Sequence, residues 1–413
     1  MKWLSLTALH KLLSVKLTIY PNGGKMSNNT YQLEPSGRSL DSKRYLWLAS
    51  PILPLLPLLG LWFYHLTASE WVLAFPLVLS YIGLPLLDLI FGEDESNPAD
   101  SAIEQLENDS YYRWLTYLTV PTHFISLFAF AIFVGTTPVS IAAVIVLALS
   151  SGAFSGLAIN TAHELGHKKS RFEKALARIT LAVPFYGHFC IEHNRGHHRD
   201  VATPEDPASS RMGESIYRFM IREIPGTLKR GWNAEIERLA RLNLPPLSFR
   251  NHIVQSYFIS ILIYLVLTLI YGWLVLLFLI IQTSWAWFQL TSANYIEHYG
   301  LLRERMENGR YESCKPHHSW NANSLASNVV LFQLERHSDH HANPTRRYQS
   351  LRNFAGIPQL PTGYFGMYLV AYIPALWFKI MDKRLLATPN INGDLSKVNI
   401  DPAQRQKIYA KYA

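Results

Sequence analysis

The sequence predicts an all-α membrane protein with about six transmembrane helices and one polar, histidine-rich layer at their cytosolic end. Composition is the first observation behind this prediction: of 413 residues, 49% are hydrophobic and 13% aromatic, and only 16% are charged. Such a balance is typical of membrane proteins. The second observation is that Lys and Arg are absent from four long stretches, 45–112, 114–167, 251–302 and 361–378. These stretches are expected to contain the apolar spans.

The first 45 residues precede these stretches and are predicted to form a basic, loosely ordered arm. They carry seven Lys or Arg residues and, after Pro21, a composition rich in Asn, Gly and Ser. No small-residue cleavage site follows the apolar positions of residues 3–19, so a signal peptide is not expected. Residues 46–413 are expected to form a single membrane-embedded domain.

Six segments of this domain are apolar and long enough to cross a bilayer, which takes ~20 residues of helix. They lie near residues 46–64, 71–91, 114–134, 138–162, 253–271 and 273–296. A further apolar segment, 364–378, is only fifteen residues long and is expected to be interfacial or re-entrant.

The three short links between paired spans contain no Lys or Arg; they are residues 65–70, 135–137 and 271–272. Basic residues favour the cytosolic side of a membrane, so these links are expected to face outward and both termini to face the cytosol. Fifteen of the 38 basic residues lie between His163 and His252. That region is therefore predicted to be a cytosolic layer.

Histidine clusters occupy the predicted cytosolic ends of the spans. The fourth span ends in His163-Glu-Leu-Gly-His167, and two imidazoles four residues apart project from one helix face and can reach one metal ion. Two further histidine clusters, at 193–198 and 337–341, and one histidine after the sixth span follow the same pattern. Together the candidate ligands are His163, His167, His193, His197, His198, His298, His337, His340 and His341.

This number of imidazoles exceeds the needs of one tetrahedral zinc and divides naturally over two ions, at four or five ligands each. Imidazole suits iron, zinc, copper and nickel, so the residues alone leave the metal open. Four carboxylates stand beside these histidines and can orient an imidazole through its other nitrogen: Glu164, Glu192, Glu297 and Asp339. Direct ligation of a metal is the alternative role for Glu164 or Glu297. The pair His317-His318 lacks a partner at helical spacing and is either a metal or substrate-gate contact or an ordinary polar pair.

Two cysteines, Cys190 and Cys314, cannot supply the four thiolates of an iron–sulfur cluster, so any electrons must come from another protein. The net charge of +8 does not indicate nucleic acid, because the basic residues flank apolar spans. The small Ser80 interrupts bulky neighbours in the second span. It either packs against another helix or leaves room for an alkyl chain.

The clusters HELGHK, EHNRGHH, NYIEHYG and LERHSDHHA resemble those of bacterial alkane 1-monooxygenases, integral-membrane enzymes of the histidine-box hydroxylase and desaturase group. The resemblance covers roughly residues 42–405. The last cluster differs at Glu335, where the family more often has Gln.

The resemblance implies hydroxylation of the terminal methyl of medium- to long-chain n-alkanes with O2 at a non-haem site of two iron ions. The nine histidines would be the iron ligands. Electrons would come from reduced rubredoxin, itself reduced by an NAD(P)H-dependent rubredoxin reductase, and the alkane would enter from the lipid bilayer.

Three rival functions are weaker. A membrane fatty-acid desaturase or hydroxylase uses the same three-box di-iron site but acts on an activated acyl chain, and it is the main alternative. An intramembrane zinc protease would use the first cluster alone. A metal transporter would need polar groups inside several spans, whereas these histidines gather at one end.

Overall fold

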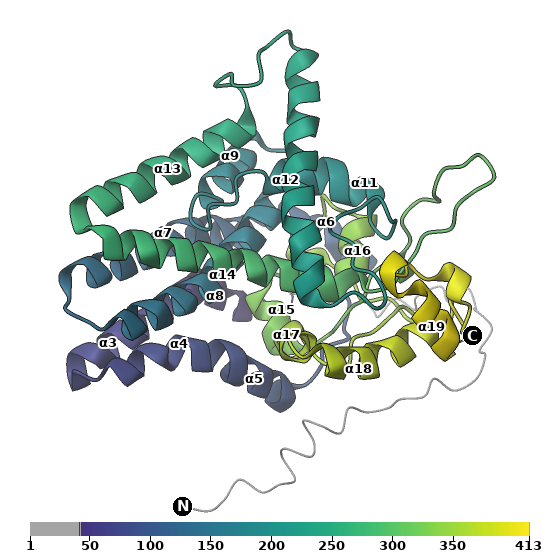
Figure 1. Cartoon of the computed structure of the whole chain (residues 1–413), viewed down its shortest axis with the longest axis horizontal. Helices are drawn as coiled ribbons and strands as arrows, with labels where there is room; N and C mark the ends of the chain where they lie inside the picture. The colour runs from purple at the N-terminus through teal and green to yellow at the C-terminus, as the bar shows by residue number, and fades with distance from the viewer. Residues whose placement is uncertain (1–40, 42, 413) are drawn as a thin grey trace, which may run out of the picture.

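The computed structural model of the chain describes residues 41 and 43–412, and these residues contain helices, turns and a few isolated β-bridges but no strand. The predicted all-α class is confirmed for them. Residues 1–40, most of the predicted basic arm, lie outside the described part of the chain. Figure 1 shows long helices lying side by side and a layer of shorter helices and loops at one end of them.

Five helical segments are long and apolar enough to cross a membrane. They are Glu70–Phe91, α7 (Ser110–Thr136), α8 (Ile141–Gly166), α13 (His252–Tyr271) and α14 (Trp273–His298). The first of them is a continuous run of η3 (Glu70–Ala74), α4 (Phe75–Val78), the π-helical η4 (Leu79–Gly83) and α5 (Leu84–Phe91). The predicted spans near 71–91, 114–134, 138–162, 253–271 and 273–296 coincide with these segments.

Two further apolar segments are bent pairs. The predicted first span consists of Leu46–Leu55, made of η1 (Leu46–Leu48), α2 (Ala49–Ile52) and η2 (Leu53–Leu55), followed by α3 (Leu58–Thr67) at 56°. Proline removes a backbone donor and clashes with the preceding turn, so Pro54 and Pro57 account for this break. In the second pair, α17 (Tyr364–Ala371) and α18 (Pro374–Leu386) meet at 119°. Up to seven spans are therefore possible, and the count of six stays a prediction.

The three hairpin links lie together at the end of the bundle opposite the histidines, at the left of Figure 1. α8 and α14 form the central pair and deliver His163 and His298 to the other end. Glycines allow their close approach, because a Cβ at Gly152 would lie 2.7 Å from the carbonyl oxygen of Gln282, and one at Gly156 would lie 2.7 Å from Cβ of Gln289. Both distances are too short for any larger residue.

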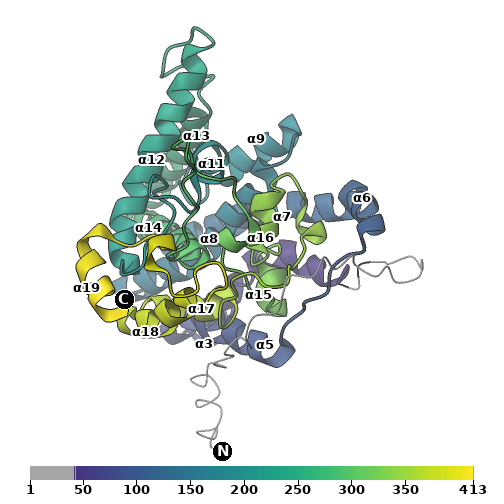
Figure 2. The same ribbon diagram turned by 90° about the vertical axis from the view of Figure 1, so that its right-hand side faces the viewer.

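Shorter elements build the layer at the histidine end. Their bounds are α6 (Asp100–Asn108), α9 (Arg171–Thr180), α10 (Phe189–Glu192), the π-helical η5 (His193–His197), α11 (His198–Asp200), α12 (Ile216–Ala240), η6 (Pro316–His318), α15 (Leu325–Val330), α16 (His337–Ala342), η7 (Tyr348–Ser350), η8 (Leu395–Lys397), η9 (Pro402–Gln404) and α19 (Arg405–Tyr412). Figure 2 views the molecule from this end and shows α12 as a long helix at its periphery.

Candidate metal centre

The structure brings all nine predicted histidines together in two adjacent groups. One group contains His163, His167, His193, His198 and His340, and the other contains His197, His298, His337 and His341. Within each group, one nitrogen from every ring lies within 4.8 Å of the others. Five and four imidazoles match the ligand numbers expected for two metal ions.

Backbone geometry explains how each histidine reaches its group. His163 and His167 stand one turn apart at the end of α8. In η5 the chain makes a π-turn, whose wider i→i+5 hydrogen bonding brings His193 and His198 to one group. His197, which lies between them in sequence, therefore points to the other group.

The short helix α16 divides its three histidines in the same way. His337 and His341, four residues apart, share the second group, and their Nε2 atoms lie 3.0 Å apart. His340 points instead to the first group, where its Nε2 lies 2.9 Å from Nε2 of His163. α16 therefore supplies histidines to both groups, as the segment of η5 and α11 does.

The ring nitrogens fit a metal site better than a hydrogen-bonded core. Nε2 of His167 and Nε2 of His197 are buried and have no hydrogen-bond partner among residues 41 and 43–412, which is costly for a polar atom. A metal ion bound by those nitrogens would remove the cost, since neutral imidazole is a good ligand. Burial lowers the pKa of His193, His198 and His340 well below the usual range and keeps them in this neutral form.

His197 differs from its neighbours in its electrostatic surroundings. Burial lowers its pKa, but the Asp206 carboxylate outweighs burial and the net pKa is raised. Oδ2 of Asp206 lies 2.8 Å from Nδ1 of His197, and both side chains are at most 1% exposed. This carboxylate fixes the proton on Nδ1 and leaves Nε2 free for a metal.

Of the four carboxylates predicted to orient histidines, only Glu297 comes near a ring of the two groups within the described residues: its Oε2 lies 3.5 Å from Nε2 of His337. This is the nitrogen that faces the other rings, so Glu297 does not orient His337 through its other nitrogen. Glu164 instead accepts from Lys168, Glu192 accepts from Arg230, and Asp339 accepts from Arg346. These ion pairs fix the ends of the helices that carry the histidines. These three carboxylates therefore act on the site through the helices and not by contact with an imidazole ring.

The sequence reasoning missed Asp206. It lies in a loop nine residues after His197, so no helical spacing links the two. Nδ1 of His298 similarly donates to the backbone oxygen of His318, 3.2 Å away, and a backbone acceptor leaves no residue-type signal. The one available signal is general: a metal-binding histidine usually donates its other ring N–H to an acceptor, so acceptors near each histidine are expected.

The pair His317-His318 lies beside the centre with Glu312, close enough to resemble a third ligand group. Nδ1 of His318 accepts from the backbone N–H of Lys315 at 2.9 Å, so the proton of the neutral ring sits on Nε2. Nε2 in turn faces Oε1 of Glu312 at 3.3 Å. His318 is therefore fully hydrogen-bonded and serves to hold the backbone oxygen that meets His298.

A mainly apolar cavity leads to the histidines between α8, α14 and α17. Ala153 and Gly156 line it on α8, Leu290 lines it on α14, and His163 and His337 close one end. Ser80 is not among the lining residues, and its hydroxyl donates to the backbone oxygen of Pro76 at 2.9 Å.

Three amide side chains interrupt the apolar lining: Asn160, Gln289 and Asn294. Nδ2 of Asn160 and Nε2 of Gln289 have no partner within the described part of the chain. Nδ2 of Asn294 donates to Oε1 of Glu223, 3.0 Å away on α12. The cavity thus offers an apolar path with a polar end near the histidines.

A helical membrane protein with nine histidines in two groups at one end of its spans, above an apolar cavity, has the form of a histidine-box membrane oxygenase or desaturase. Comparison with known proteins agrees. The fatty acid desaturase family model matches residues 138–371. The chain is also similar to proteins named alkane 1-monooxygenase, with 53% identity to that of Ectopseudomonas oleovorans over 92% of this chain and 94% of the relative.

Two more relatives of that name are 51% identical. The one from Pseudomonas putida matches over 94% of this chain and 96% of its own, and the one from Alcanivorax borkumensis matches over 90% and 92%. At such identity over nearly the full length, the chain belongs to the alkane 1-monooxygenase family.

Proposed function

We propose that this protein hydroxylates the terminal methyl of medium- to long-chain n-alkanes, giving 1-alkanols. The observation that carries the proposal is the apolar cavity that ends at His163 and His337, one from each histidine group. An alkane has no polar handle, so a protein can only bury it in an apolar channel and present its end to the oxidant. The names of the relatives support the same reaction.

Two iron ions held by the nine histidines would supply dioxygen activation in this site. The reaction consumes the alkane, O2, two electrons and two protons, and yields the alcohol and water. The chain's own residues orient the substrate and fix the imidazoles: Asp206 and the His318 backbone oxygen each hold the proton of one ring on Nδ1. Neutral rings with free Nε2 atoms are the form required for iron.

The cavity also bears on chain length. Ala153 and His163 stand ten residues apart on α8 and both line it, which corresponds to ~15 Å of helix rise. An extended alkyl chain advances roughly 1.3 Å per methylene, so a chain of about ten to twelve carbons spans that length. Entry of the alkane from the bilayer is favoured because alkanes partition there.

A route for the alkyl chain along Ser80 remains a separate proposal.

Reduced rubredoxin is the proposed electron donor, docking on a cytosolic face of a bacterial inner-membrane protein. A polar pocket above the second histidine cluster supports this placement. Four basic residues and two acidic ones line it: Arg195, Arg199, Lys229, Arg230, Glu205 and Glu237. Arg230 ion-pairs with Asp206, which contacts His197. An acidic carrier would be attracted to this surface.

The test is a reconstitution in lipid nanodiscs with rubredoxin, its reductase, NADH and n-alkanes of graded length under 18O2. The expected product is a 1-alkanol carrying 18O, from protein with about two irons per chain. An unsaturated product without 18O, or activity on acyl thioesters in preference to alkanes, would favour a desaturase. Full activity with one zinc per chain would refute the proposed centre.

A further inference from the structure

α12 is a 25-residue helix that is absent from the candidate spans. It runs across the histidine end of α13 and α14 and not alongside them, as both Figure 1 and Figure 2 show. One row of its residues packs against the protein, including Phe219, Glu223 and Thr227. The two flanks of this row differ in chemistry.

One flank is apolar and exposed. Tyr217, Ile221 and Leu228 are 45%, 71% and 41% exposed, and their spacing of four and seven residues places them on one side of the helix. The opposite flank is polar, with exposed Lys229 and Asn233. An exposed apolar stripe beside a polar one on a surface helix indicates a site of contact with another apolar surface.

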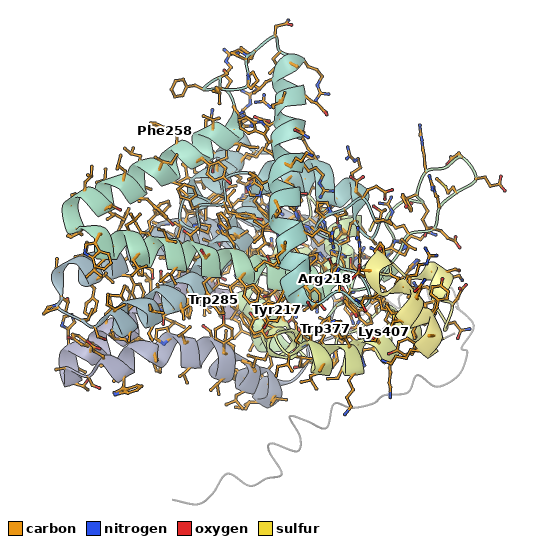
Figure 3. The ribbon with its side chains drawn as sticks, viewed as in Figure 1. Tyr217, Arg218, Phe258, Trp285, Trp377 and Lys407 are labelled. Carbon is orange, nitrogen blue, oxygen red and sulfur yellow. The ribbon has the colours of Figure 1, made fainter. Side chains whose placement is uncertain are left out.

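Contacts at the start of α12 show which way each flank faces. The ring of Tyr217 stacks on Phe288 of span α14, with centroids 6.4 Å apart, and its hydroxyl donates to the backbone oxygen of Tyr372 at the bend between α17 and α18. Arg218 pairs with Asp401 in the C-terminal segment at 2.8 Å. In Figure 3, Tyr217 accordingly lies on the side of Trp285, and Arg218 on the side of the C-terminal helices.

The loop after α12 repeats the pattern. Leu247 and Phe249 are 76% and 79% exposed, and the ring of Phe249 lies 6.5 Å from that of Phe258, a 55% exposed residue of span α13. Phe258 points away from the bundle in Figure 3. The apolar flank of α12 therefore adjoins span α14 at its start, and the loop after α12 reaches the outer face of span α13.

We propose that α12 lies in the plane of the membrane, with Ile221 and Leu228 in the acyl chains at the boundary of the leaflet on the histidine side. Lys229 and Asn233 would face water. The occupant of this surface is the lipid bilayer, because the spans α13 and α14 that adjoin it at both ends are the segments that lipid must surround. The predicted cytosolic layer would then include a helix that is half immersed in lipid.

The placement has a consequence for the cavity. Glu223, on the buried row of α12, accepts from Thr291 at 2.7 Å and from Asn294 at 3.0 Å, and both donors belong to α14. Asn294 lines the cavity. A lipid-seated α12 would therefore hold, through Glu223, the Asn294 side chain in the cavity wall.

The test uses nitroxide labels on full-length protein in nanodiscs. Ile221→Cys and Leu228→Cys report the apolar flank, and Lys229→Cys and Asn233→Cys are matched controls on the same helix. Collision with O2, which concentrates in lipid, is compared with collision with a water-soluble nickel chelate. Cys190 and Cys314 are half-buried free cysteines, so labelling of the unsubstituted protein is measured as the background.

Labels at 221 and 228 are expected to collide several-fold more with O2 than with nickel, and those at 229 and 233 to show the reverse. Equal nickel access at all four positions would place the whole helix in water and overturn the proposal. Protection of 221 and 228 from both reagents would show that protein covers the flank, such as a second copy of the chain, and would overturn it as well.

Discussion

Asp206→Asn is the sharpest test of how the site is built, because Asp206 accepts four hydrogen bonds while fully buried. Its Oδ1 accepts from Arg230 Nη2 at 2.7 Å and from the backbone N–H of Ala208 at 3.0 Å. Its Oδ2 accepts from Ser209 Oγ at 2.7 Å and is the acceptor for Nδ1 of His197 at 2.8 Å. Asparagine keeps one oxygen, so its NH2 must face one of these pairs.

The chemistry of the donors decides the orientation. Arg230 and the backbone N–H of Ala208 can only donate, so the asparagine oxygen is expected to stay with them. Ser209 can rotate its hydroxyl to accept, and His197 can accept at Nδ1 if its proton moves to Nε2. That tautomer has no lone pair at Nε2 for a metal.

The expected effect is a loss of metal affinity at the four-histidine group. Removing the partner of a metal-binding histidine costs roughly 10–100-fold in affinity, or about 1.4–2.7 kcal/mol. A misplaced buried donor costs about 1–3 kcal/mol, which is the same range. We therefore expect iron content near one per chain after a chelator challenge that leaves two in the parent protein.

The assay is iron per chain and the rate of iron loss to a chelator in nanodiscs, with thermal unfolding of the metal-free protein as a check of the fold. Asp200→Asn is the matched control, since Asp200 pairs with the 70% exposed Arg199 and, like Asp206, reaches Arg230, at 3.5 Å. No ion pair joins its carboxylate to a histidine among the described residues. If the folded Asp206→Asn protein retained two irons and lost them at the parent rate, the proposed role of Asp206 would be wrong.

Three further predictions follow from the same geometry. His340→Ala should abolish hydroxylation and lower iron content because it removes a ligand, whereas His317→Ala, outside both groups, should keep its iron; retention of iron and activity in both variants would contradict the shared site. Turnover limited by reduction should slow as salt rises, because the pocket that contains Arg195 and Lys229 is basic; a rate insensitive to ionic strength would count against docking there. Ala153→Leu should shift products toward shorter alkanes with iron content unchanged, since Ala153 lines the cavity ~15 Å from His163. Ser80→Trp should have the same effect only if the alkyl chain runs along the second span. An unchanged product profile in the Ser80→Trp protein would make Ser80 a packing residue.

The sequence alone determined the helical membrane class, the position of the long spans and the identity of the candidate ligands. These properties are local. A stretch without Lys or Arg, such as 251–302, is apolar whatever surrounds it, and His163 and His167 share a face in any helix. Family resemblance rests on the same local motifs, and the relatives agree with it.

Only the tertiary structure decided how the parts combine. His193, His197 and His198 are neighbours in sequence, yet a π-turn sends His197 to the other metal group. Asp206 reaches His197 because of an irregular loop, so no helical spacing in the sequence links the two residues. α12 has the composition of a cytosolic helix, and only the contact of Tyr217 with Phe288 relates its apolar flank to a membrane span. Such pairings depend on turns and long-range packing, which single-residue hydropathy and spacing do not encode.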